Sequence, residues 1–243
     1  MVPFTIILVS DPEVAEANAR RAWRDAVGVS LATGAYGISF GALAMSSGLD
    51  IWQTCVLSLL MFTGGSQFAF IGVIGTGGLA AAPAAIASAA LLGIRNVAYG
   101  MRMSSLIGRG TAKRVAAAHV TIDESVAVAL AQKDMRARRI GFWATGVGIF
   151  AGWNLMTLVG AIVGDVLGDP RAWGLDAAAA AAFVALLWPR LKSRQAVAVG
   201  VAAAVVATAV TPIVMPGAPV LIAASVAVIV GWFNVVGRRE VGA

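Results

Sequence analysis

Hydrophobic positions fill most of this chain in long runs, and charged positions gather in short clusters between them. No charged residue occurs between Ile51 and Ile94, or between Gln195 and Gly237. About 20 helical residues cross the hydrocarbon core of a bilayer, so each of these runs is long enough for two passes. The chain lacks the alternating segments of about ten residues that mark barrel strands in membranes. The pattern therefore predicts an all-α polytopic membrane protein.

Seven segments have the length and low charge of transmembrane helices. Some of them contain helix-breaking residues near the expected midplane, such as Gly64-Gly65. The run after Gln195 divides at Thr211–Gly217 into two passes. The seven segments are 26–49, 51–74, 79–105, 140–164, 172–188 and the two halves of 195–237.

An eighth candidate span, 115–132, is long enough to cross but carries three titratable residues. The basic clusters decide its status, because Lys and Arg gather on the cytoplasmic side of a membrane. Placing the clusters near residues 20–24 and 133–139 on that side requires an even number of crossings between them. Either 115–132 spans, which gives eight helices, or 79–105 is re-entrant, which gives six and a hairpin. We expect eight, with both termini cytoplasmic.

The sequence predicts a short N-terminal segment followed by one transmembrane domain. Asp11 or Ser10 as N-cap, Pro12 at the first helical position and Glu13 in the first turn predict a helix start. Residues 1–25 are expected to form an amphipathic segment on the membrane surface. Residues 26–237 form a single transmembrane domain. The triplet Gly-Leu-Asp occurs at 48–50 and again at 174–176, which indicates a two-fold internal repeat.

Composition excludes several classes of function. Hydrophobic residues make up 59% of the chain and charged residues only 12%, about half the charge of a soluble domain. The net charge of +6 comes from clusters between apolar spans, so we expect no nucleic-acid partner. The single Cys55 excludes an internal disulfide. We expect no cofactor and no metal site.

The stretch Thr63–Gln67 is the first candidate binding site. Gly64 and Gly65 weaken a helix in mid-span, while Ser66 and Gln67 bring polar side chains to the same depth. Unwound helices of this kind let transporters bind a zwitterion through exposed N–H groups and carbonyls. The alternative is a small-residue packing contact in which Gln67 forms an interhelical hydrogen bond.

A second group of polar residues follows the uncharged run. Arg95, Tyr99 and Arg102 share one helical face, and Asn96 lies beside the first of them. A guanidinium at membrane depth is a functional hypothesis by default, and Arg95 could bind a substrate carboxylate with two hydrogen bonds. It could instead form an internal ion pair with Asp123 or Glu124 that holds helices together.

Asp123 and Glu124 are the candidates for proton coupling. Adjacent carboxylates at membrane depth disfavour each other's charged form, which suits a proton relay. His119 shares a helical face with Asp123 but is more simply a packed histidine. If 115–132 is a surface segment, both acids are solvated instead.

Several linked motifs together resemble the AzlC family, the large subunit of branched-chain amino acid exporters. The resemblance covers residues 22–232. It implies a proton-driven exporter of valine, leucine, isoleucine and sometimes methionine in the bacterial inner membrane, and a small AzlD-like membrane subunit as partner. His119 has no place in the family pattern. The motifs are FTGGSQFAF (Phe62–Phe70), GIRNVAYGMRMS (Gly93–Ser104), TIDES (Thr121–Ser125) and GLDAAAAAAFVALLWPRLKSR (Gly174–Arg194).

Two other classes of function compete with an exporter. An intramembrane protease built on Ser66 and His119 would need both groups in hydrogen-bond reach and an oxyanion hole. No GxSx motif with a later GxxxH-like span is present, so we expect no enzyme. A passive channel or scaffold subunit without coupled transport remains the alternative to an exporter, and uncoupler-sensitive counterflow separates the two. The pocket is expected between the broken spans at Gly64–Gln67 and Arg95–Tyr99.

Overall fold

The computed structural model describes residues 12–167, 184, 187–188, 191–214 and 217–233. Every regular element in these residues is a helix. The elements are α1 (Pro12–Ala35), α2 (Gly37–Ser46), α3 (Ile51–Leu60), α4 (Gly64–Gly77), the 3-10 helix η1 (Gly78–Ala81), α5 (Ala82–Gly93), α6 (Arg95–Ile107), α7 (Thr111–His119), α8 (Asp123–Ala131), α9 (Met135–Leu167), α11 (Arg194–Val210) and α12 (Ala218–Phe233).

Side-chain caps set the start of several helices. Asp50 and Gln53 form a capping box at α3, with the Gln53 N–H donating to Asp50 at 2.7 Å and the Asp50 N–H donating to Gln53 at 3.0 Å. Ser193 accepts a hydrogen bond from the Ala196 N–H at the start of α11. Such caps satisfy N–H groups that have no partner within the helix. The expected N-cap Asp11 lies outside the described residues.

Two internal breaks have sequence causes. α3 and α4 are separated at Met61–Thr63, directly before Gly64-Gly65, a pair with low helix propensity. α7 and α8 are separated at residues 120–122, where Val, Thr and Ile follow one another. Three β-branched side chains in a row lose rotamer freedom in a helix, which favours the extended backbone at Ile122.

The chain divides into two compact units. Unit 1 comprises residues 1–36 and 95–155, and unit 2 comprises residues 37–94 and 156–243. Two of the three divisions coincide with the short helix breaks at Tyr36 and Ile94.

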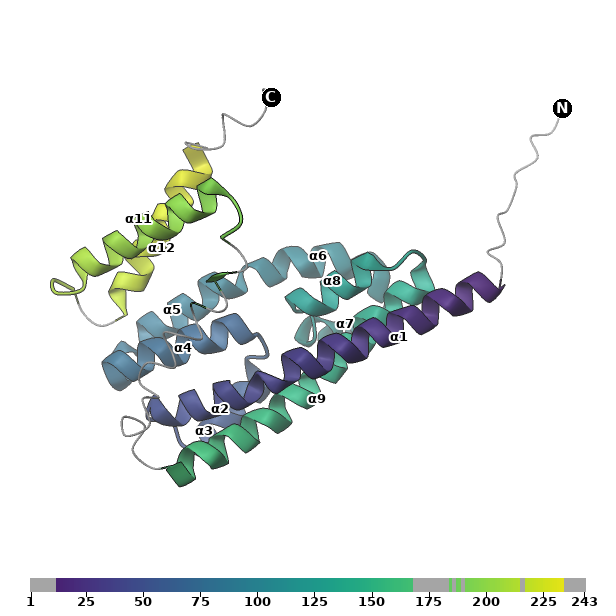
Figure 1. Cartoon of the computed structure of the whole chain (residues 1–243), viewed down its shortest axis with the longest axis horizontal. Coiled ribbons are helices and arrows are strands. Elements are labelled where there is room, and N and C mark those ends of the chain that lie inside the picture. The colour runs from purple at the N-terminus through teal and green to yellow at the C-terminus, as the bar shows by residue number, and fades with distance from the viewer. Residues whose placement is uncertain (1–11, 168–183, 185–186, 189–190, 215–216, 234–243) are drawn as a thin grey trace. The chain divides into compact units, whose positions relative to one another are not determined.

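In unit 1, α1 and the first part of α9 run side by side in the same direction (Figure 1). Asn18 donates a hydrogen bond to Asp134 at 2.9 Å, next to the start of α9. Further along both helices, a side chain on Gly34 would lie 3.3 Å from the backbone of Gly152. Small residues allow this close approach of helices in lipid.

The short helices α7 and α8 form a hairpin in unit 1 whose two ends lie on one side. Arg139, near the start of α9, donates a hydrogen bond to the carbonyl of Leu106 at the end of α6. α7 therefore begins on the side of unit 1 where α9 begins. The tip of the hairpin lies further along α9, where Val120 contacts Gly146. α8 then returns along α9, and Gln132 after its end hydrogen-bonds Asp25 of α1.

Helices α3 and α4 form another hairpin, in unit 2. It comes earlier in the chain and is called the first hairpin, and the hairpin of α7 and α8 is called the second. α3 runs antiparallel to α2. The Thr54 hydroxyl, near the start of α3, contacts the sulfur of Met45 near the end of α2, and Ser58, further along α3, hydrogen-bonds Thr157 of α9. α4 runs in the same direction as α2: the rings of Phe68 and Phe40 are 5.7 Å apart, and a later Cβ at Gly75 would meet Ser47. Both ends of this hairpin therefore lie on the side where α2 ends.

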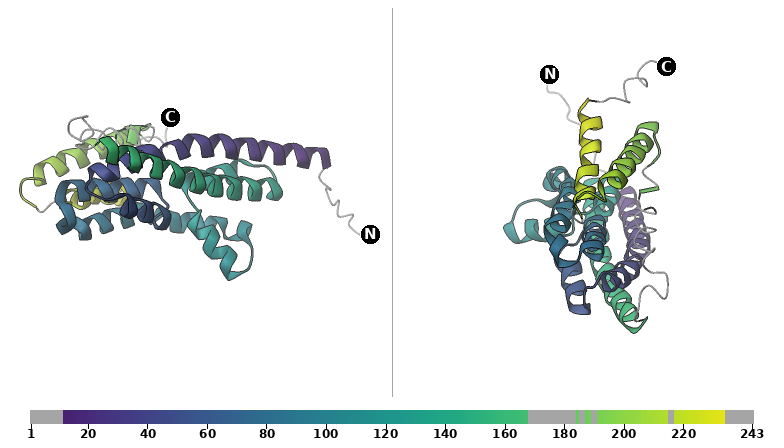
Figure 2. Two further views of the ribbon diagram at one scale, coloured as in Figure 1. Left: turned by 90° about the horizontal axis from the view of Figure 1, so that it is seen from below. Right: turned by 90° about the vertical axis from the view of Figure 1, so that its left-hand side faces the viewer.

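Two further helix pairs complete unit 2. α4 and α5 are packed closely side by side, as are α11 and α12 (Figures 1 and 2). Gly217, directly before α12, lies against the first pair: its φ is +86°, and a Cβ there would be 2.6 Å from both Val73 and Ala84.

The all-α polytopic membrane class is confirmed. Among the described residues, three helical runs are long and apolar enough to cross a membrane, by length and composition alone: Pro12–Ser46, Gly64–Ile107 and Met135–Val166. Three shorter apolar helices accompany them. The run 12–46 contains α1, which has no break at residue 25.

Two expected passes need correction. Segments 51–74 and 115–132 are not single spans, since the structure folds each into a hairpin at residues 61–63 and 120–122. The apolar sequence predicts membrane-depth helix but does not say where the chain turns back. The expected span 172–188 and the second Gly-Leu-Asp triplet lie almost wholly outside the described residues.

Candidate functional site

The turn of the first hairpin, residues 61–67, is the glycine tip. Thr63 has an extended backbone and precedes α4 without making a side-chain hydrogen bond to it. The first N–H groups of an α-helix have no partner within the helix. In α4 these N–H groups belong to Gly64, Gly65 and Ser66, and the side chain of the N-cap residue Thr63 caps none of them. The positive end of a helix dipole lies at the same place.

Ser66 and Gln67 face the interior of unit 2, with exposed fractions of 1% and 0%. The Ser66 hydroxyl donates to the carbonyl of Ala89 on α5 at 2.8 Å. The Gln67 amide nitrogen donates to the carbonyl of Ser58 on α3 at 3.3 Å. These bonds connect the start of α4 to both neighbouring helices.

Two buried oxygen atoms near these bonds have no hydrogen-bond partner among the described residues. They are Oε1 of Gln67 and the hydroxyl of Ser88, which is 3% exposed and precedes Ala89 on α5. A buried acceptor without a partner costs about 1–3 kcal/mol. Sequence analysis missed Ser88, although it is the one polar residue of α5. The glycine tip therefore holds unused hydrogen-bonding capacity.

The turn of the second hairpin, residues 120–125, is the acidic tip. The Arg95 side chain, at the start of α6, forms an ion pair with Asp123, with 2.8 Å between Nε and Oδ1. The two side chains are 25% and 28% exposed. Of the two roles weighed for Arg95, the structure contains the internal ion pair.

Hydrogen bonds within the acidic tip fix its backbone. Thr121 donates its hydroxyl hydrogen to the carbonyl of Ala117 at 2.6 Å. The Ser125 hydroxyl accepts from the Ile122 N–H at 3.0 Å, while the Ile122 side chain, like that of Thr63 at α4, makes no capping hydrogen bond to its helix. Glu124 is half-buried in the first turn of α8. Both carboxylates thus lie at the positive end of α8.

The remaining candidates on α6 and α7 have separate surroundings. Oδ1 of Asn96 is buried without a hydrogen-bond partner among the described residues. Tyr99 is partly buried against a core that includes Met103 and Phe142. Arg102 is exposed. His119 stacks edge-on against Phe150, with 5.4 Å between ring centroids.

The predicted site residues therefore fall into two groups, one in each unit. Thr63–Gln67 belong to unit 2, and Arg95, Asn96, Tyr99, Asp123 and Glu124 belong to unit 1. The common pocket expected from the sequence stays a prediction.

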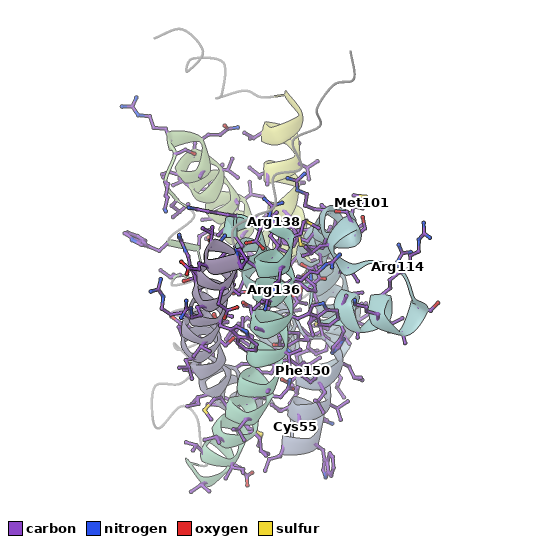
Figure 3. All side chains as sticks on the ribbon, turned by 90° about the vertical axis from the view of Figure 1, so that its right-hand side faces the viewer. Cys55, Met101, Arg114, Arg136, Arg138 and Phe150 are labelled. Carbon is purple, nitrogen blue, oxygen red and sulfur yellow. The ribbon has the colours of Figure 1, made fainter. Side chains whose placement is uncertain are left out.

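Charged residues gather where α1 and α9 begin. Arg136 lies 3.7 Å from Glu16, and Figure 3 labels Arg136 and Arg138 toward one end of the view and Phe150 below them. Asp134 caps α9 by accepting from the Ala137 N–H at 2.8 Å. That hydrogen bond, with another from Asn18, lowers the pKa of Asp134. The basic clusters of α1 and α9 thus lie on one side of unit 1.

One cavity among the described residues lies away from both tips, and no cluster of metal-ligating side chains accompanies it there. A cavity of about 670 Å³ lies along α11, lined by residues 191–194, 197–198 and 201–202, and it holds none of the predicted residues. The part of the chain that the structure describes has no group of three or more His, Cys, Asp or Glu side chains placed to hold a metal ion.

Comparison with known proteins identifies a family. A family model described as AzlC protein matches residues 28–167, more than half of the chain, and the match contains both tips. No curated protein and no solved structure matches the chain.

Proposed function

Since the chain belongs to the AzlC family, a family of membrane transport proteins, we propose that it exports branched-chain amino acids. It does so as the large subunit of a two-component exporter in the bacterial inner membrane, driven by the proton gradient. Valine, leucine and isoleucine are the proposed substrates, with methionine as a further one.

The uncapped start of α4 is the observation that carries this proposal. The free N–H groups of Gly64, Gly65 and Ser66 and the dipole of α4 favour a carboxylate at the glycine tip. Two glycines leave the backbone open to a close approach, because neither has a side chain. Discontinuous helices use this arrangement to bind substrate carboxylates in other transporters.

The rest of an amino acid also finds partners near the glycine tip. Gln67 Oε1 and the Ser88 hydroxyl are buried and have no hydrogen-bond partner among the described residues, and each could accept a hydrogen bond from an ammonium group. Phe62 and Phe68, which are 7% and 2% exposed, give the surroundings the apolar character that a branched side chain needs. A few polar groups in an apolar setting are typical of small-molecule sites.

The ion pair of Arg95 and Asp123 is the proposed coupling element. Protonation of Asp123 neutralises its carboxylate and removes the charge that holds Arg95. The guanidinium then needs another anionic partner, since an uncompensated charge in low dielectric is unfavourable. Glu124, adjacent in the chain, is the second proton acceptor. Proton binding and ion-pair rupture are thereby linked.

The proposed topology has six crossings, both termini in the cytoplasm and two hairpins that do not cross. The hairpin of α7 and α8 then leaves Arg102, Arg109, Lys113 and Arg114 on the same side as the clusters at 20–24 and 133–139, as the positive-inside rule favours. A small AzlD-like subunit is the proposed partner within the bilayer.

Counterflow in proteoliposomes tests the function. Vesicles containing this chain and its small partner, preloaded with unlabelled leucine, should accumulate labelled leucine, and a proton gradient should drive net transport that an uncoupler abolishes. Leucinol, which lacks the carboxylate, should compete at least tenfold less well than leucine, because removing a charged hydrogen bond costs about 1.5–3 kcal/mol. Leucine flux without counterflow would indicate a passive channel. Full export by this chain alone would contradict the two-component proposal.

A further inference from the structure

The two hairpins are separated by a constant distance in the sequence. Met45-Ser46-Ser47 and Met103-Ser104-Ser105 are 58 positions apart, as are Thr63 and Thr121. The same spacing relates Phe62–Phe70, FTGGSQFAF, to Val120–Val128, VTIDESVAV. In both stretches a threonine follows one apolar residue, and an alanine stands between two others. These matches suggest two copies of one ancestral segment.

The helices repeat with the same spacing. α1 ends at Ala35 and α5 at Gly93, and a single residue separates each from the next helix. α2 and α6 then begin 58 positions apart, at Gly37 and Arg95. The starts of α3 and α7, and those of α4 and α8, are offset by nearly the same amount. Each copy is therefore one interrupted helix followed by one hairpin.

Burial and packing repeat as well. The pairs Phe62 and Val120, Phe68 and Val126, and Ile71 and Ala129 are each buried at both positions. α2 packs against α3 and α4, and its counterpart α6 packs against α7 and α8. Equivalent positions are thus buried in equivalent packing in the two copies.

We infer that residues 24–77 and 82–135 are inverted copies, and that their hairpins enter the membrane from opposite sides. The orientation follows from chain order: a copy with one crossing helix and one non-crossing hairpin crosses an odd number of times. The next copy therefore starts on the opposite side and is inverted, as in many transporters.

Charge assigns the side on which each hairpin opens. The ends of the first hairpin, near residues 46–50 and 75–81, contain no Lys or Arg, whereas Arg109, Lys113 and Lys133 flank the second. The first hairpin opens outward and the second to the cytoplasm. The inverted repeat itself does not rest on the proposed function.

Single cysteines in a Cys55→Ala background test the orientation without any transport assay. Trp52 and Leu79 mark the two ends of the first hairpin and are 79% and 87% exposed. Arg109 and Lys133, also exposed, mark the ends of the second. Ile213, which is 79% exposed, serves as the control for the outer side and is preferable to the tightly packed Gly217.

In intact cells, cysteines at Trp52, Leu79 and Ile213 should react with a membrane-impermeant maleimide added outside. Cysteines at Arg109 and Lys133 should react only with a permeant maleimide or after permeabilisation. Opposite labelling of Trp52 and Leu79, or of Arg109 and Lys133, would show that the segment crosses the membrane and would overturn the inversion, because a copy that crosses an even number of times does not invert the next one. Labelling of all four from one side would overturn the inversion. Neither result depends on which substrate is carried.

Discussion

The glycine tip and the acidic tip share a backbone design but differ in chemistry. Both are turns between two short helices, with a threonine near the turn and a buried apolar face behind it. The glycine tip is neutral, and α4 has no side-chain cap from Thr63. The acidic tip carries Asp123 and Glu124 in the first turn of α8, and the Ser125 hydroxyl accepts from the Ile122 N–H.

In the proposed function, this difference assigns ligand binding to the glycine tip and proton coupling to the acidic tip. An uncapped helix start without charge favours an anion, whereas two carboxylates at a helix start oppose one unless they are neutralised. Gly64-Gly65 at one tip correspond to Ile122-Asp123 at the other. A change of two residues in a repeated hairpin can thus turn one site toward substrate and the other toward protons.

Breaking the ion pair at the acidic tip should have the largest effect. Arg95→Gln and Asp123→Asn should each reduce leucine counterflow at least tenfold and destabilise the protein by about 1–2 kcal/mol. That is below the 3–5 kcal/mol of a fully buried pair, because about a quarter of each side chain is exposed. Unfolding in detergent and counterflow measure the two effects.

The double variant Arg95→Gln/Asp123→Asn should regain most of the lost stability, because it leaves no charge without a partner, but it should not regain transport. Arg102→Gln, on the exposed face of α6, is the matched control and should change neither. Additive destabilisation in the double variant would show that the pair does not couple the two residues.

The two tips should differ in how well a nearby glycine tolerates replacement by alanine. A Cβ at Gly146 would lie 2.9 Å from Val120 of the acidic tip, whereas one at Gly93 would meet only the Ser66 hydroxyl, at 3.6 Å. Gly146→Ala should therefore cost about 1–3 kcal/mol through overpacking, and Gly93→Ala should be neutral or stabilising. Thermal unfolding of the two variants checks this, and equal effects would contradict the packing described here.

The cap of α9 should give the smallest effect. Asp134→Ala should destabilise by about 1 kcal/mol and Asp134→Asn by less, because Asn also caps helices well. Folding lowers the pKa of Asp134, so its contribution is present above the pKa of the unfolded chain, about 3.9. It is lost as the pH falls through the native pKa. Denaturant unfolding at neutral and acid pH should show Asp134→Ala approaching the wild type in acid.

The sequence could predict the class of fold because it depends on composition and run length. The uncharged run from Ile51 to Ile94 could only be membrane helix, and the break at Gly64-Gly65 followed from two residues with low helix propensity. The reversals of direction were not predictable in the same way. A hairpin of two ten-residue helices and one crossing helix have nearly the same hydropathy, and only contacts such as Phe40 with Phe68 distinguish them.

The candidate site was predictable in its residues but not in its pairings. Periodicity placed Arg95 and Tyr99 on one face, yet it could not choose between a substrate and Asp123 as the partner of Arg95. Ser88 escaped notice because a lone serine in an alanine-rich helix carries no pattern. Its role depends on a contact across two helices, Ser66 to Ala89, which no local spacing encodes.

Leucine binding to the purified protein tests the central claim, that the glycine tip binds the amino acid. The experiment compares the leucine dissociation constants of three proteins, the wild type, Gln67→Ala and Thr76→Ala. All three must have equal thermal stability. Thr76 lies at the far end of α4 and hydrogen-bonds only carbonyls of its own helix, so its variant is the matched control. Gln67→Ala should raise the dissociation constant roughly tenfold or more, since a hydrogen bond to a charged group is worth about 1.5–3 kcal/mol, while Thr76→Ala should leave it unchanged. Equal affinity in all three proteins would show that Gln67 only holds helices together and that leucine binds elsewhere.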